Sequence, residues 1–361
     1  MLKNIYDVIV IGAGPAGGKT AELAASIGLN VLIIEEHKEI GLPIQCTGIV
    51  SHRITSLSGL KEKDIVINKV NKARFYSQNG NFLELESKKP VYVIDRHKLD
   101  KNIVKEAVKK GAEILTGVRF RNFERSNNHL KIHTSLGNFK TKLLVGADGP
   151  NSIVARSAKI EQPRNYLIGY QETIQGDFSD NIVELWFGKN IAPDFFAWVV
   201  PENKNWARVG LAAKNKTVDY FRKFIEKRFK QEYNKKDVLG GVIKYGLIKS
   251  SVEDNVLLVG DAASHIKPYS GGGIIYGLIA ARFAAIACAV AVEKNRFDRE
   301  FLKKEYDQKW KKILSPVIKR GLLLHNLIHM MPDWLFSFSL SITKPFRPLL
   351  NKIDMDLLFT Q

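Results

Sequence analysis

The chain has 361 residues, of which 45% are hydrophobic and 25% charged, so its composition is that of an ordinary globular protein that can bury a sizeable core. Lysine and arginine exceed aspartate and glutamate by 55 to 37, a formal net charge of +18. That charge favours an anionic partner, although scattered lysines more often only form a solvated surface. No zinc-ligand cluster, RNA-binding signature or helix-turn-helix pattern occurs in the sequence, so we expect no metal and no nucleic acid partner.

The cysteines and the apolar stretches indicate a location in the cell. The chain has two cysteines, Cys46 and Cys288, far apart in sequence, which argues against a disulfide framework and for a reducing compartment. The first expected strand begins close to the N-terminus, so we expect no signal peptide and a cytoplasmic protein. Residues 272–292 form the longest apolar stretch, but it is rich in alanine and glycine, and it predicts a buried helix rather than a membrane span.

The N-terminal segment contains a strand followed by a glycine-rich turn. Residues 6–11 form a run rich in β-branched residues, typical of a strand buried on both faces of a parallel sheet. The run leads into the G-x-G-x-x-G spacing at 12–17. Gly12 permits the tight turn, Gly14 lets the backbone approach a pyrophosphate, and Gly17 lets the next helix pack closely on the strand.

The segment after this turn completes a dinucleotide-binding unit. The spacing predicts a helix over 16–27, whose positive N-terminal end would point at the phosphates. A second strand follows over 30–34, and Glu35 at its carboxyl end is in register to bind the ribose hydroxyls. Strand, turn, helix and acid agree, so we predict an adenine dinucleotide here, with FAD and NAD both open.

The rest of the chain alternates between strands, helices and turns. The predicted strands and hairpins are 65–85, 91–94, 113–123, 130–134, 139–145, 167–174, 182–187, 195–200, 207–212 and 256–259. The predicted helices are 98–110, a short one capped by Asn151 or Ser152, 218–233, the apolar helix 272–292, and much of the chain from 301 onward.

Two further turns that combine glycine and an acid follow predicted strands. One contains Asp148 and Gly149, and the other contains Gly260 and Asp261 and ends at the glycines of 271–273. In this order the three turns resemble the FAD-binding pattern of the para-hydroxybenzoate hydroxylase and geranylgeranyl reductase superfamily, over most of the first 290 residues.

The resemblance implies that the cofactor is FAD. Asp261 would hold the ribityl chain, the backbone N–H groups of Gly272 and Gly273 would meet the flavin or its phosphate, and Arg96 matches the arginine ahead of the adenine-side helix. The cofactor-binding residues that follow are Gly12, Gly14, Pro15, Ala16, Gly17, Glu35, Glu36, Cys46, Thr47, Ile49, Arg96, Val118, Asp148, Gly149, Gly260, Asp261, Gly272, Gly273 and Ile274.

Two more segments resemble the geranylgeranyl reductase branch. The segment 41–51 is similar to its cysteine loop beside the flavin ring, which makes Cys46 a catalytic candidate; by residue type alone we would expect a small buried hydrophobe. The segment 192–201 resembles its substrate motif, with Phe196 in place of the tyrosine and Val200 in place of the phenylalanine. The substrate residues we expect are Phe196, Trp198, Pro201, Tyr269 and Tyr276, each with ordinary core packing as the alternative.

The implied activity is an FAD-dependent reductase that saturates C=C bonds of geranylgeranyl or polyprenyl chains on a membrane lipid precursor or a prenyl diphosphate. No second G-x-G-x-x-G occurs, so electrons would come from transiently bound NAD(P)H or from a ferredoxin-like carrier. A flavin monooxygenase acting on an apolar substrate and a basic binding protein with a structural FAD are the alternatives. The cysteine loop and the motif at 192–201 favour the reductase.

The resemblance also implies a fold, which is α/β (α+β overall). It consists of a Rossmann-like FAD-binding domain (1–70, 91–158 and 246–300), an inserted antiparallel β-sheet substrate domain (71–90 and 159–245) and a C-terminal helical region (301–361). In the last region Trp334, Leu335, Phe336 and Phe338 form a candidate patch for peripheral contact with an anionic membrane at its inner face. A terminal pair of helices packed on the body is the equal alternative.

Overall fold

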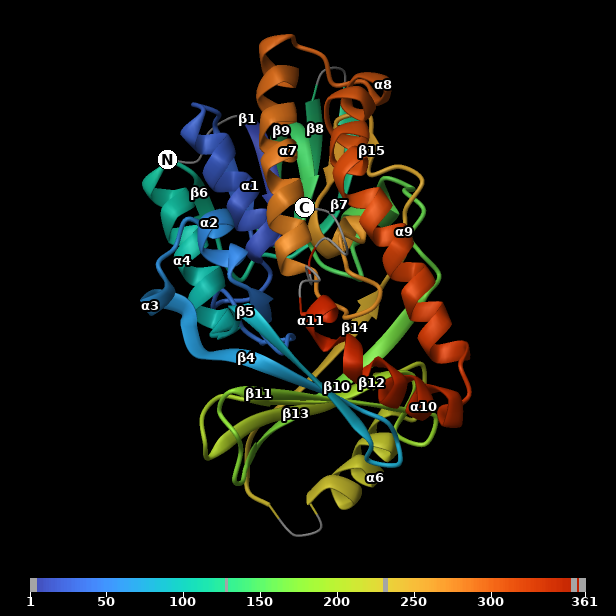
Figure 1. The fold of residues 1–361 in the computed structure, drawn as a ribbon. Helices are drawn as coiled ribbons and strands as arrows, with labels where there is room; N and C mark the ends of the chain where they lie inside the picture. Colours follow the sequence, from blue (N-terminus) through green and yellow to red (C-terminus); the bar gives the residue numbers. More distant parts are fainter. Residues whose placement is uncertain (1–4, 127–128, 230–232, 352–355, 357–361) are drawn as a thin grey trace.

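The computed structural model describes residues 5–126, 129–229, 233–351 and 356, and these residues build two β-sheets with helices around them (Figure 1). The first sheet holds the N-terminal strand at its centre, and the second lies below it in the view of Figure 1. The mixed α/β fold with two sheets and a helical C-terminal region confirms the fold class expected from the sequence.

The first sheet has the strand order β15-β16-β9-β1-β2-β6, and β7 and β8 extend it beyond β9. Its strands are β1 (Tyr6–Ile11), β2 (Val31–Ile34), β6 (Glu113–Leu115), β7 (Phe120–Ser126), β8 (His129–Thr134), β9 (Asn138–Gly146), β15 (Val252–Glu253) and β16 (Val256–Leu258). The central strand β1 pairs in parallel with β2 and β9, and β9 pairs in parallel with β16. The carboxyl ends of these four strands therefore meet at one edge, where open α/β sheets bind ligands.

Three helices pack side by side against this sheet: α1 (Pro15–Ser26), α4 (Arg96–Lys109) and α7 (Ile274–Glu293), with α1 in the middle (Figure 1). Within the described residues, α7 is the one helix that length and composition would allow to cross a membrane, but 61% of its most apolar window is buried. It begins close to the expected position, and its small residues pack against α1 in the core.

The second sheet has the order β14-β10-β13-β12-β11-β4-β5-β3. Its strands are β3 (Ile49–Ser51), β4 (Val66–Tyr76), β5 (Phe82–Ile94), β10 (Tyr166–Gln175), β11 (Ile182–Gly188), β12 (Ala192–Pro201), β13 (Trp206–Ala213) and β14 (Lys235–Lys244). The pairs are antiparallel except β11 with β4, so the described sheet is mixed rather than purely antiparallel.

The long ribbon of β4 and β5 differs from the predicted pattern. The residues 91–94, expected as a separate strand, form the end of β5, because its ladder with β4 resumes after an irregularity between Val70 and Lys72. Conversely, 113–123 is split into β6 and β7. The expected domain boundaries at residues 70 and 91 fall inside β4 and β5, which both belong to the second sheet.

The remaining helices pack around the two sheets. They are α2 (Arg53–Ser58), α3 (Glu62–Ile65), α5 (Ile153–Ser157), α6 (Thr217–Phe229), η1 (Gly260–Ala263), α8 (Arg299–Leu302), η2 (Lys303–Asp307), α9 (Gln308–Met330), α10 (Asp333–Thr343), η3 (Lys344–Phe346) and α11 (Arg347–Leu350). Helix α6 packs on one face of the second sheet. The helix expected over 218–233 includes residues 230–232, which lie outside the described residues. Helix α9 runs from beside the first sheet down to the second, where α10 follows it (Figure 1).

Candidate functional site

The first glycine turn is tightly packed at Gly12 and Gly17 and has free space at Gly14. Gly12 has φ +101°, and a Cβ added there would lie 2.4 Å from the carbonyl oxygen of Ala147. A Cβ added to Gly17 would lie 2.1 Å from the carbonyl oxygen of Gly12, so the helix packs as closely as its sequence spacing predicts. At Gly14, by contrast, an added Cβ would meet nothing within 4 Å. The turn, with Pro15 and Ala16 opening α1, therefore leaves the space that a pyrophosphate needs.

Glu35 is held beside this turn. One carboxylate oxygen accepts the N–H of Ala13 at 2.8 Å, and the other accepts the N–H of His37 at 2.9 Å. The N–H of Val118 donates to the carbonyl of Glu35 at 2.9 Å, which places Val118 next to the same strand end. Glu36 points elsewhere and pairs with Arg119 at the surface, at 3.0 Å. Glu35 and Val118 thus border the region expected for the adenosine half of the cofactor, while a contact from Glu36 stays a prediction.

The second turn is braced by its own aspartate. The carboxylate of Asp148 accepts hydrogen bonds from Ser152 Oγ at 2.6 Å and from the N–H groups of Ile153 and Val154 at 2.7 and 3.1 Å. Burial raises the pKa of Asp148, although these hydrogen bonds oppose the rise. Ser152 caps α5, as its sequence position predicts. The carboxylate of Asp148 therefore accepts hydrogen bonds from the turn itself. A Cβ added to Gly149 would meet nothing within 4 Å, so the space for a ligand lies at Gly149.

The third turn touches the first. A Cβ added to Gly260 would lie 2.8 Å from the side chain of Ala16, and one added to Gly273 would lie 2.4 Å from Oδ1 of Asp261. Burial raises the pKa of Asp261 to about 6, against the charge of Arg96, which lowers it. In the described part of the chain no group donates a hydrogen bond to this carboxylate. A partly exposed carboxylate that accepts no hydrogen bond from the described residues can accept the hydroxyl groups of a ribityl chain, so these residues fit FAD.

Arg96 connects this turn to the cysteine loop. It opens α4 and forms a two-pronged ion pair with Asp100, with Nε–Oδ1 at 3.2 Å and Nη2–Oδ2 at 2.9 Å. Burial disfavours its charge, but Asp100 and the Cys46 side chain outweigh burial and raise the pKa of Arg96. The guanidinium of Arg96 therefore interacts electrostatically with both Cys46 and Asp261, so the structure brings these three predicted residues together.

The cysteine loop is anchored to the second sheet. The Sγ of Cys46 accepts the N–H of Gly48 at 3.3 Å, and the hydroxyl of Thr47 donates to Gln171 Oε1 at 2.8 Å. Arg208 on β13 donates from Nη1 to the carbonyls of Thr47 and Ile94. Ile49 follows as the first residue of β3.

Arg208 and Gln171 are site residues that the sequence reasoning missed. Arg208 also donates from Nε to Glu202 at 2.8 Å, so its planar fork joins the loop to the sheet from a largely buried position. The signal available in the sequence was a lone arginine inside the apolar strand 206–213, since an unexplained charge in a buried strand needs partners.

An aromatic cluster borders the third turn. We give this name to Phe187, Phe195, Phe196 and Trp198, which lie in one buried group on the face of the second sheet opposite α6. The rings of Phe195 and Phe196 stack with centroids 4.1 Å apart. A Cβ added to Gly271 would lie 3.6 Å from the ring of Phe195, so the cluster lies next to the glycine loop that precedes α7.

The expected substrate residues divide between this cluster and other places. Phe196 and Trp198 belong to it, and Trp198 Nε1 donates to Gln171 at 2.9 Å. Pro201 lies at the end of β12 outside the cluster, because the two-residue period of a strand turns it away from the face of Trp198. Tyr269 and Tyr276 pack with the core of the first sheet. A contact between these last three residues and a substrate stays a prediction. Among the described residues, no group of three His, Cys, Asp or Glu side chains could hold a metal ion.

Comparison with known proteins shows the family to which the chain is similar. Residues 5–292 match the family described as FAD binding domain. The chain is 31% identical over 353 residues to the digeranylgeranylglycerophospholipid reductase of Methanosarcina acetivorans, covering 92% of this chain and 87% of that one. It is 32% identical over 349 residues to digeranylgeranylglycerophospholipid reductase 2 of Methanothermobacter thermautotrophicus, covering 91% and 89%.

Solved structures share the fold. A geranylgeranyl bacteriochlorophyll reductase-like protein from Thermoplasma acidophilum superposes with a TM-score of 0.87 at 24% identity, covering 98% of this chain and 94% of that chain. The p-nitrophenol 4-monooxygenase PnpA from Pseudomonas putida superposes with a TM-score of 0.73 at 16% identity, covering 97% and 98%. By sequence match and site, the chain belongs to the geranylgeranyl reductase family of FAD-dependent oxidoreductases.

Proposed function

We propose that this protein is an FAD-dependent reductase that saturates C=C bonds in geranylgeranyl or longer polyprenyl chains of a lipid precursor. The observation that carries the proposal is that the buried aromatic cluster lies beside the glycine loop at Gly271 and shares Gln171 with the cysteine loop. The sequence identity to proteins named digeranylgeranylglycerophospholipid reductase supports the same substrate class.

The residues of the site suit reduction of an isolated alkene. When bound and reduced, FAD supplies a hydride, and the product also needs a proton. The aromatic cluster offers an apolar wall that aligns a prenyl chain and excludes water. Arg208 fixes the cysteine loop, which carries Cys46, through the carbonyls of Thr47 and Ile94.

A buried pair next to the cluster is a candidate source of the proton. Tyr245 Oη and His325 Nε2 lie 3.1 Å apart, and the ring of His325 is 6.3 Å from that of Phe195. Burial lowers the pKa of His325 and raises the pKa of Tyr245, so both groups are neutral near pH 7. The phenol therefore keeps its proton near pH 7, and we propose it as the donor to the reacting carbon, with His325 as its hydrogen-bond partner.

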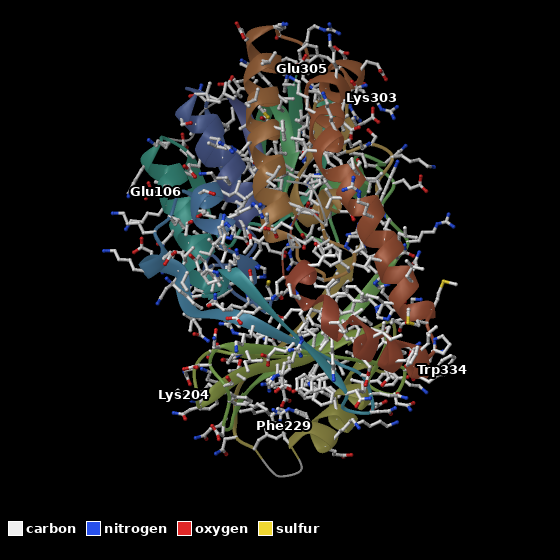
Figure 2. All side chains as sticks on the ribbon, in the orientation of Figure 1. Glu106, Lys204, Phe229, Lys303, Glu305 and Trp334 are labelled. Atoms are coloured by element: carbon white, nitrogen blue, oxygen red, sulfur yellow. The ribbon has the colours of Figure 1, made fainter. Side chains whose placement is uncertain are left out.

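The C-terminal helices carry an exposed apolar stripe, which supports peripheral contact with a membrane from the cytoplasmic side. Trp334 projects outward from α10 (Figure 2), and Phe338 follows four residues later on the same helix. The predicted Phe336 instead faces inward against Phe187, with ring centroids 5.1 Å apart. The exposed apolar side chains of this stripe are Leu323, Leu327, Met330, Trp334, Phe338, Ile342, Phe346 and Leu349.

Liposome flotation tests the membrane contact. We expect the FAD-loaded protein to float with vesicles that contain anionic lipid, and a variant with Trp334→Ser and Phe338→Ser to float less. Exposed Leu136→Ser, in the turn between β8 and β9, is the matched control. Equal flotation of the stripe variant and the control would contradict the contact.

The reductase activity is tested anaerobically. The bound flavin is reduced, a geranylgeranylated glycerophospholipid is added, and flavin absorbance and lipid mass are followed together. We expect the flavin to be reoxidised while the lipid gains two hydrogens per turnover. A requirement for oxygen with a hydroxylated product would instead identify a monooxygenase. Supplying reduced ferredoxin or NADPH in separate reactions then identifies the electron donor.

A further inference from the structure

A buried glutamine joins the cysteine loop to the aromatic cluster. Gln171 lies on β10 with 3% of its surface exposed, and its Oε1 accepts hydrogen bonds from the hydroxyl of Thr47 at 2.8 Å and from Trp198 Nε1 at 2.9 Å. The indole N–H can only donate, so the atom that faces Trp198 must be the amide oxygen and not the nitrogen. These contacts fix the orientation of the amide and leave Nε2 for another partner.

The amide nitrogen of Gln171 carries two N–H groups, and both lack an acceptor. Within residues 5–126, 129–229, 233–351 and 356, no atom accepts a hydrogen bond from Nε2, although this nitrogen is buried. Buried polar groups in folded proteins are nearly always hydrogen-bonded, because an N–H group removed from water without an acceptor loses free energy. A buried donor between two elements of the site therefore indicates a partner that the described chain does not supply.

The strand around the glutamine leaves room for such a partner. Successive residues of a strand point to opposite faces, so Tyr170 lies on the other face, where it packs on Phe221 of α6 with ring centroids 4.9 Å apart. On the face of the site, a Cβ added to Gly169 would meet one atom within 4 Å, a backbone oxygen at 3.6 Å. Its strand partner Gly241 lies below the cysteine loop, because a Cβ added there would lie 3.7 Å from Cβ of Gln45.

The neighbouring strand holds the aromatic cluster against the same amide. A Cβ added to Gly210, the residue of β13 that pairs with Gln171, would lie 2.6 Å from Cζ2 of Trp198. The indole therefore lies over β13, directly beside the amide. The cluster lies next to the glycine loop through Phe195 and Gly271. The amide thus belongs to the region that the cysteine loop, the aromatic cluster and the glycine loop enclose.

From this arrangement we propose that Nε2 of Gln171 donates a hydrogen bond to a carbonyl oxygen of the bound flavin ring. A prenyl chain is hydrocarbon where it reacts and offers no acceptor, whereas the pyrimidine half of the flavin ring has two carbonyl oxygens. The ring continues from the ribityl chain, and Asp261, which can hold that chain, belongs to the same turn as Gly271. The inference rests on the FAD cofactor and not on alkene reduction, so the two can fail separately.

This hydrogen bond would stabilise the reduced cofactor more than the oxidised one. Reduction adds electron density to the ring carbonyls, and hydrogen bonds to charged acceptors are about twice as strong as those to neutral acceptors. The oxygen of the same amide holds Thr47 and Trp198. Gln171 would therefore set the position of the cysteine loop and of the aromatic cluster relative to the flavin ring.

Two variants separate the donor of this amide from its acceptor. Gln171→Met has a side chain of similar length without an N–H group, whereas Thr47→Val removes one hydrogen bond to Oε1 and keeps Nε2. Fluorescence titration of the full-length, flavin-free protein measures binding of oxidised FAD and, anaerobically, of reduced FAD. We expect Gln171→Met to weaken binding of oxidised FAD about fivefold and of reduced FAD about 30-fold. Thr47→Val should change both affinities by the same factor.

The infrared spectrum of the bound flavin gives a readout that a purely structural role would not move. FAD labelled with ¹³C at its two ring carbonyls identifies their stretching bands. In Gln171→Met a carbonyl band should shift to higher frequency, because a C=O bond stiffens when it loses a hydrogen bond. The bands should stay in place in Thr47→Val and in the matched control Gln175→Met, which replaces an exposed glutamine of the same strand.

Several outcomes would overturn the assignment. Unmoved bands in Gln171→Met, with equal losses for oxidised and reduced FAD, would show that the amide does not bind the ring. Weaker binding of geranylgeraniol with unmoved bands would assign the donor to the substrate hydroxyl instead. A higher melting temperature of the flavin-free variant as the only change would show that the donor has no ligand.

A second variant keeps the test decisive if Gln171→Met does not fold. Gln171→Glu retains the oxygen that holds Thr47 and Trp198 and replaces the NH₂ group by an oxygen. A carbonyl band should then shift to higher frequency if the new carboxyl is ionised, or to lower frequency if it donates its more acidic proton. Unmoved bands would again overturn the assignment. Shifted bands without alkene saturation would support the role of Gln171 and contradict the reductase.

Discussion

Gly14 and Gly17 allow the cofactor site to be tested separately from the fold. Gly14 has φ −68°, which any residue adopts, and its added Cβ meets nothing within 4 Å. Alanine at this N-cap lowers the free energy of unfolding by about 0.5–1 kcal/mol, because it is a poorer cap than glycine. It raises the same free energy by about as much, because the unfolded chain is less flexible. Gly14→Ala should therefore leave the flavin-free protein as stable as the wild type. In Gly17→Ala the new methyl would lie 2.1 Å from a backbone oxygen, and we expect a loss of about 3 kcal/mol or more.

The methyl of Gly14→Ala fills the space that the pyrophosphate needs. Losing one charge-assisted hydrogen bond to the phosphates costs about 1.5–3 kcal/mol, which weakens FAD binding about 10- to 100-fold. At an FAD concentration of about 100 times the wild-type Kd, FAD stabilises the wild type by about 2.7 kcal/mol, and a variant with a Kd raised about 100-fold by only about 0.4 kcal/mol. The difference corresponds to about 3 °C in Tm for a chain of 361 residues.

Differential scanning fluorimetry with and without FAD measures both effects in one experiment. Without FAD, Gly14→Ala should have the Tm of the wild type and Gly17→Ala a lower Tm. The Tm of Gly14→Ala should not rise when FAD is added. A Gly14→Ala protein that gains as much Tm from FAD as the wild type would refute the assignment of this turn to the pyrophosphate.

Three further predictions address the other turns and the cysteine loop. In flavin-free protein, folded Asp261 keeps its proton up to pH about 6, whereas the unfolded chain releases it near 3.8, so the free energy of unfolding should fall as pH rises between these values. Thermal melts of Asp261→Asn should lack this pH dependence. An unchanged pH dependence in the variant would contradict the raised pKa. Arg208→Lys loses the fork that holds the carbonyls of Thr47 and Ile94, and urea unfolding should show a loss of about 3 kcal/mol that the exposed control Arg222→Lys does not share. Cys46→Ser should retain FAD absorbance but slow alkene reduction in an anaerobic single turnover, and an unchanged rate would remove the thiol from the mechanism.

The glycine turns could be predicted because their constraints are local. Gly17 must be glycine since a backbone oxygen lies next to its Cα, and the G-x-G-x-x-G spacing encodes this contact within six residues. The same holds for Glu35, whose distance along the chain from the turn is set by one helix and one strand. The family resemblance added the second and third turns, and the structure brings the third turn against the first through Gly260 and Ala16.

Contacts between distant segments could not be predicted in this way. Asp356 shows no pattern that connects it to Arg53, and Arg208 reaches the cysteine loop only because β13 lies beside it in the folded chain. Strand alternation told us that β4 and β5 exist but not which sheet they join, because burial on one face is common to both sheets. The exposure of Trp334 and the contact of the partly buried Phe336 with Phe187 likewise depend on how α10 packs.

The pairing of β3 with β5 has a consequence for how the enzyme senses its substrate. Ile49 pairs with Val93, so the strand that follows the cysteine loop is hydrogen-bonded into the sheet that holds the aromatic cluster and not into the sheet of the dinucleotide turn. A prenyl chain that separates the rings of the aromatic cluster would shift the Sγ of Cys46 relative to the flavin before any electron is transferred. The visible spectrum of the oxidised, resting protein should therefore change when a fully saturated product analogue is added.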